Sequence, residues 1–136
     1  MIYAVIDTNV LVSAMLKSGS NPGIVIAECL SGNITPVLNE EILSEYNEVL
    51  RRKKFGFSES VVVRIIEGLK IRGMYADKKT ADETMPDPKD IVFYEVTMSA
   101  RDKEESYLVT GNIKHFPIKP FVITPKEMVE MLKKSY

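Results

Sequence analysis

Short apolar runs alternate along the chain with segments whose apolar residues recur every three to four positions. The first run, residues 2–6, has no polar face, as expected for a strand buried on both sides of a parallel sheet. Similar runs predict strands at residues 34–38, 107–110 and 121–123. Between residues 74 and 87 the pattern fades into polar residues, so we expect any strand there to be short and at a sheet edge.

Helical periodicity and capping residues predict six helices between these strands. Candidate first residues or caps are Asn21, Asn39, Ser58, Asp90 and Thr124, because each precedes an apolar-periodic segment and carries a side chain able to accept a helix N–H. Thr124 also has a glutamate three residues later, which makes a capping box. The predicted helices span about residues 10–16, 22–30, 40–50, 58–72, 91–100 and 125–134.

This alternation of strands and helices predicts an α/β fold with a mostly parallel sheet covered by helices on both faces. No repeat, low-complexity tract or linker interrupts residues 1–136, so we expect a single domain. In such folds ligands bind beyond the carboxyl ends of the strands. Residues that follow the strands are therefore the first place to look for chemistry.

Composition agrees with a folded domain and narrows the compartment. Of 136 residues, 45% are hydrophobic and 27% charged, which is ordinary globular usage. The single cysteine, Cys29, forms no intramolecular disulfide, and Asp7 interrupts the first apolar run, unlike a signal peptide. No run is long enough to cross a membrane. We expect a cytoplasmic protein that has no membrane contact.

The net charge of −1 gives no overall signature of a nucleic-acid-binding domain. Charge is uneven, however, because Arg51, Arg52, Lys53 and Lys54 form a basic block. One interpretation is a helix C-terminus whose cations complement the helix dipole. The other is a patch that contacts phosphates, and both can hold together.

Three residues are predicted to meet at the carboxyl edge of the sheet: Asp7 directly after the first strand, Asn112 two residues after the strand at 107–110, and Asp90 ahead of its helix. At 100° per residue, Glu45 lies on the border of the apolar face of the helix at 40–50, whereas Glu41 and Glu48 point away. Oxygen ligands without cysteine or histidine suit Mg²⁺ or Mn²⁺ better than Zn²⁺.

Each acid also has a purely structural interpretation. Asp90, taken alone, is better explained as a helix cap, and Asp7 could cap the helix that follows it. Asp87, before Pro88, is typical of a turn. Only the convergence of the acids, which depends on the predicted topology, favours a metal site.

Four separated segments resemble those of PIN-domain ribonucleases, especially the toxin-like prokaryotic group. Their order and spacing cover nearly the whole chain. They are Ile6-Asp7-Thr8-Asn9-Val10-Leu11-Val12-Ser13-Ala14, Glu41-Ile42-Leu43-Ser44-Glu45-Tyr46-Asn47-Glu48-Val49-Leu50, Asp87-Pro88-Lys89-Asp90, and Val109-Thr110-Gly111-Asn112-Ile113-Lys114-His115-Phe116-Pro117.

The resemblance implies a three-layer α/β/α sandwich with a parallel sheet of about four to five strands, and hydrolysis of single-stranded RNA with one or two Mg²⁺ or Mn²⁺ ions. By position, Asp7, Glu45 and Asp90 would be the metal-binding and catalytic acids, supported by Thr8, Asn9 and Thr110. Many family members have a fourth acid where this chain has Asn112, whose amide oxygen can ligate an ion but adds no negative charge. His115, three residues on, suits a structural hydrogen bond better than a general base.

Two other functions stay open at this point. Haloacid-dehalogenase-like phosphatases also place an aspartate after an apolar first strand, but they have a second acid where this chain has Asn9. A PIN-like scaffold that binds RNA or protein without cutting is favoured by Asn112 and opposed by the three intact acids. The resemblance further suggests a homodimer and a small antitoxin partner.

Overall fold

The computed structural model describes residues 1–80 and 88–135. Its centre is a sheet of five parallel strands in the order β3-β2-β1-β4-β5. The predicted parallel α/β architecture is confirmed, including the short third strand at a sheet edge. The strands are β1 (Ile2–Ile6), β2 (Ile34–Leu38), β3 (Met74–Tyr75), β4 (Ser106–Val109) and β5 (Val122–Ile123).

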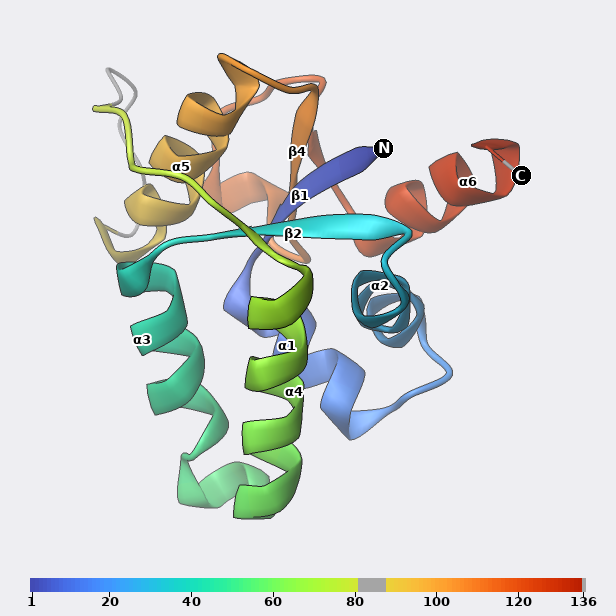
Figure 1. Cartoon of the computed structure of the whole chain (residues 1–136), viewed down its shortest axis with the longest axis vertical. Coiled ribbons are helices and arrows are strands. Elements are labelled where there is room, and N and C mark those ends of the chain that lie inside the picture. The colour runs from blue at the N-terminus through green and yellow to red at the C-terminus, as the bar shows by residue number, and fades with distance from the viewer. Residues whose placement is uncertain (81–87, 136) are drawn as a thin grey trace.

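Helices lie on both faces of this sheet, which gives three layers (Figure 1). Helix α5 contacts β1, β2 and β4 from one side, while α2 and α4 contact β2 from the other, and α6 packs on α2. The helices are α1 (Thr8–Leu16), α2 (Asn21–Ser31), α3 (Glu40–Leu50), α4 (Glu59–Arg72), α5 (Ile91–Arg101) and α6 (Pro125–Ser135), with short 3₁₀ turns η1 (Lys53–Phe55), η2 (Pro88–Asp90) and η3 (Ile113–His115).

Three of the five predicted caps are confirmed. Asn39 and Ser58 accept N–H groups of α3 and α4, and Thr124 forms its capping box with Glu127. The cap of α2 is Ser20 and not Asn21, because the Ser20 hydroxyl accepts the Gly23 N–H. Pro22 then occupies the second helical position, where its missing N–H costs nothing.

The core lies between the sheet and the helices, and it fixes the position of α3. The apolar face predicted for α3 is buried, and Tyr46 from this face donates a hydrogen bond of 2.5 Å to the carbonyl of Ile6 at the end of β1. Each large apolar side chain that is fully buried adds about 1.5–3 kcal/mol relative to exposure. The result is that α3 stands beside the carboxyl end of the central strand.

Among the described residues, no single helix combines the length and hydrophobicity needed to cross a membrane. The pair α1 and α2 reaches those limits only when its two helices are taken together, and the two are bent by 102°.

Candidate active site

Asp7 occupies the carboxyl end of the central strand and is 4% exposed. Its backbone N–H donates to the carbonyl of Val109 (2.9 Å), and its Oδ2 accepts a hydrogen bond from the hydroxyl of Thr110 (2.8 Å). Although Asp7 holds the N-cap position of α1, its side chain makes no capping hydrogen bond. The hydrogen bond from Thr110 therefore ties this buried carboxylate to the loop that follows β4.

The surroundings of Asp7 disfavour its negative charge. Burial raises the pKa of the carboxyl, and the neighbouring charge of Asp90 raises it further, while the Thr110 hydroxyl and the backbone at Thr8 and Asn9 lower it. The net change is upward, because desolvation is the largest of these effects. A cation beside Asp7 would offset both unfavourable contributions.

Glu45 reaches the same region from α3. It is half-buried, whereas Glu41 and Glu48 are exposed, which confirms the orientation predicted from helical geometry. The hydroxyl of Thr8 donates a short hydrogen bond to Glu45 Oε2. This contact joins the first residue of α1 to α3 and holds the Glu45 carboxylate near Asp7.

Asp90 ends the turn η2 and precedes α5, but the prediction that it caps this helix is wrong. Its backbone is in the helical region, with φ −80° and ψ −15°, and its side chain makes no capping hydrogen bond. A capping side chain needs an extended backbone, whereas here the chain enters α5 from a 3₁₀ turn. Asp90 Oδ2 instead lies 3.2 Å from His115 Nδ1, the structural hydrogen bond expected for His115. Asp87, the predicted turn residue, lies outside the described residues.

These three acids come from separate segments and line one cavity of about 230 Å³. Its walls also carry Arg52 and Lys89, so cations face the carboxylates. The lining residues are Asp7, Thr8, Asn9, Glu45, Val49, Arg52, Lys89 and Asp90. Lys89 was not singled out from the sequence, although its place directly before Asp90 could have indicated it.

Within the described residues, no three side chains of histidine, cysteine, aspartate or glutamate are grouped closely enough to enclose a metal ion. Mg²⁺ does not require such a cage, because it keeps several waters and is usually held by one or two carboxylates together with substrate phosphates. Asp7 and Asp90, which repel each other across the cavity, meet that requirement.

Asn112 lies beside the acids rather than among the residues that line their cavity. It faces an adjacent cavity of about 390 Å³, and Asn9 lines both cavities. The nearer residue of this loop is Thr110, which donates to Asp7 and accepts the Asn112 N–H at 2.9 Å. Thr110, directly after β4, thus faces Asp7, whereas Asn112 faces the second cavity.

The basic block divides into residues with different surroundings. The Arg51 guanidinium is held by Glu59 (2.8 and 2.9 Å) and by the Asn47 amide (2.6 Å). The Arg52 guanidinium lies 3.5 Å from the Glu48 carboxylate, and Arg52 also lines the acid cavity. An exposed pair of this length contributes little stability, so Arg52 is the member of the block most available to a ligand at the acids.

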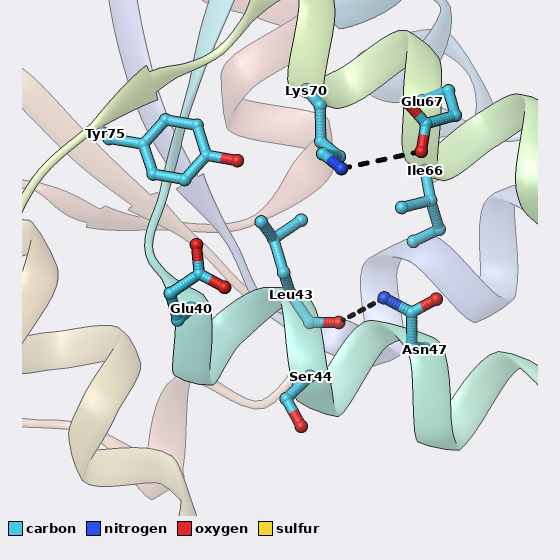
Figure 2. A pocket seen from close by; sticks show the side chains of 8 residues that line it. All are labelled: Glu40, Leu43, Ser44, Asn47, Ile66, Glu67, Lys70 and Tyr75. Carbon is cyan, nitrogen blue, oxygen red and sulfur yellow. Dashed lines mark hydrogen bonds and ion pairs between the residues drawn. The ribbon is translucent and has the colours of Figure 1, made fainter.

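A further cavity, of about 360 Å³, lies between α3 and α4 on another side of α3 (Figure 2). Three of its polar side chains are paired within their own helices: Asn47 donates to the Leu43 carbonyl, and Lys70 lies 3.5 Å from Glu67. The acids Asp7, Glu45 and Asp90 do not line it. We therefore assign the candidate site to the acid cavity.

Comparison with known families agrees with this geometry. The family model described as PIN domain matches residues 3–114. The chain belongs to the PIN-domain family. PIN domains are generally nucleases, and the matched segment of this PIN domain contains all three acids and Asn112. Searches of curated proteins and of solved structures each found no significant match.

Proposed function

We propose that this PIN domain is a Mg²⁺- or Mn²⁺-dependent endoribonuclease that hydrolyses single-stranded RNA. The observation that carries the proposal is the cavity in which Asp7, Glu45 and Asp90 converge from β1, α3 and η2 with two cationic side chains beside them. Carboxylates suit a hard divalent ion, and the cations suit the charge of a phosphodiester. The haloacid-dehalogenase alternative has no support here, because the second acid of that chemistry is replaced by Asn9.

The chain's own residues would hold the reacting groups in place. Asp7 and Asp90 would hold the divalent ion, with Glu45 facing it from α3. When bound, the ion would supply a Lewis acid that activates water and offsets charge on the phosphodiester. Arg52 and Lys89 would bind phosphate oxygens, and the Thr8 and Thr110 hydroxyls keep two of the carboxylates in fixed orientations.

The test uses the full chain with a labelled single-stranded RNA. We expect cleavage with Mn²⁺ or Mg²⁺, loss of cleavage in EDTA, and loss in Asp7→Asn without loss of the fold. The matched control is Asp77→Asn, the same change on an exposed aspartate, which should cut like the wild type. Cleavage in EDTA would overturn the metal-dependent mechanism, and RNA binding without cleavage under all metals would favour the scaffold function.

A role as the toxin of a toxin–antitoxin pair, acting as a homodimer, is proposed from the family resemblance alone. A small DNA-binding protein encoded beside this chain, which inhibits the cleavage and co-purifies with it, would support that role. Undiminished RNA cleavage in the presence of that small protein would argue against the toxin role.

A further inference from the structure

We infer that the cavity beside the acids is a nucleobase pocket, which holds one base of the RNA next to the phosphodiester that is cut. The inference rests on the proposed function and goes beyond it, because it assigns base recognition to residues outside the acid cavity. The walls of this second cavity carry amide, hydroxyl and aromatic side chains. The lining residues are Asn9, Val10, Val12, Ser13, Pro22, Phe55, Gly111, Asn112 and Pro125.

The two cavities are neighbours, because Asn9 lines both of them. Asn9 follows Asp7 by two residues at the start of α1. A phosphodiester beside Asp7 would therefore have an attached nucleoside within reach of the second cavity. At about 390 Å³, this cavity falls in the range of roughly 300–1,000 Å³ that is usual for small-ligand pockets.

Amide groups suited to reading a base edge line this pocket. In the part of the chain that the structure describes, the side-chain amides of Asn9 and Asn112 have no hydrogen-bond partner, whereas the Asn112 backbone N–H is satisfied by Thr110. Each amide offers both donors and an acceptor. Single-stranded RNA is recognised through hydrogen bonds of this kind to unpaired base edges. An asparagine at position 112 thus has a use that a fourth acid would not have.

An aromatic ring lines the same pocket, and a cation lies beside that ring. Phe55 in η1 stacks on Phe57, with ring centroids 5.6 Å apart and an interplanar angle of 14°, and Lys54 Nζ lies 5.1 Å from the Phe55 centroid. Aromatic side chains that stack on bases, next to cations that follow the backbone, are the usual equipment of single-strand binding sites. This arrangement gives Lys54 a phosphate-binding role next to the base.

Gly111 leaves one wall of the pocket open. A Cβ built on Gly111 meets no atom within 4 Å, and its φ is not positive. A larger side chain can therefore be introduced without a clash inside the protein, and it would occupy space that a base needs. Gly19, in the loop before α2, is equally open but lines neither the acid cavity nor this pocket, which makes it a matched control.

The experiment uses the full chain and combines changes in the protein with changes in the RNA substrate. Cleavage efficiency is measured in Mn²⁺ on a single-stranded RNA with one defined cut site, and on the same RNA with an abasic nucleotide on either side of the cut bond. We expect Phe55→Leu and Gly111→Leu to lower efficiency on the intact RNA about tenfold or more. One of the two abasic RNAs lacks the base that is expected to bind in the pocket. On that RNA the wild type should also cleave about tenfold less efficiently, and the variants should show little further loss of cleavage efficiency.

Gly19→Leu is the control, because Gly19 is equally open and lines neither the acid cavity nor this pocket. It should cleave intact RNA like the wild type. Losses that are equal on intact and abasic RNA, or a control as defective as the test variants, would overturn the pocket while the nuclease function stands. If the wild type does not cut, affinity for intact and abasic RNA is compared instead, and a base-dependent loss in Phe55→Leu or Gly111→Leu would still support the pocket.

Discussion

Replacing Tyr46 with phenylalanine tests how α3 is fixed beside the central strand. Tyr46 is 1% exposed, and its hydroxyl donates to the Ile6 carbonyl at 2.5 Å. The change removes this donor and leaves a buried carbonyl without it, which costs about 1–3 kcal/mol. In a chain of this size each kcal/mol lowers the melting temperature by roughly 3–5 °C.

The assay is urea unfolding of the metal-free protein followed by circular dichroism, with the free energy of unfolding compared at constant slope. Tyr107→Phe is the control, because its hydroxyl bonds to Glu105 at the surface (3.0 Å), and we expect it to change stability by less than about 0.5 kcal/mol. A loss in Tyr46→Phe as small as that of the control would refute the claim that this hydrogen bond anchors α3 to β1.

Three further predictions concern the charges of the site. Burial raises the pKa of Asp7 in the folded protein, so the Asp7 carboxyl contributes fully to the stability of the metal-free protein below the ordinary aspartate pKa. This contribution is lost as the pH rises through the raised pKa of the folded state. The free energy of unfolding of Asp7→Asn should not show this fall over the same pH range. Thr110→Val removes a hydrogen bond that lowers that pKa, so the acid limb of the cleavage profile should move to higher pH, and an unmoved limb would exclude the effect. Arg52→Ala should reduce the salt dependence of RNA affinity by about 0.7 in the logarithmic slope, whereas Arg51→Ala, whose guanidinium is already bound to Glu59, should leave the slope unchanged.

The fold could be predicted from the sequence because the signals for its strands and helices are local and agree with one another. The apolar run at residues 2–6 and the caps Asn39 and Ser58 each predict an element that the structure contains. The cap of α2 was misplaced by one residue because Ser20 and Asn21 are both good caps, and the choice depends on which side chain the loop turns toward the Gly23 N–H. Helix α1 likewise starts at Thr8 and not at residue 10, because neither Thr8 nor Asn9 prevents the helix from extending to include it.

The site was predictable only as far as its geometry followed from helices and strands. The orientation of Glu45 came from helical periodicity, and the position of Asp7 from the end of a strand. Side-chain partners in loops depend on tertiary contacts that have no local pattern. This is why the Asp90 contact with His115, the place of Asn112 in the second cavity and the approach of Lys89 to the acids required the structure.

The most direct measurement of the central claim is the rate of RNA cleavage as Mn²⁺ is titrated, recorded together with the melting temperature of the same sample. For the wild type, cleavage should saturate once the site is filled, while stability should keep rising with the logarithm of the free Mn²⁺ concentration and reach about 2.7 kcal/mol at roughly 100 times the dissociation constant. Asp7→Asn should show neither rise. Cleavage that needs no metal, or an Asp7→Asn protein that cuts as fast as the wild type, would contradict the account.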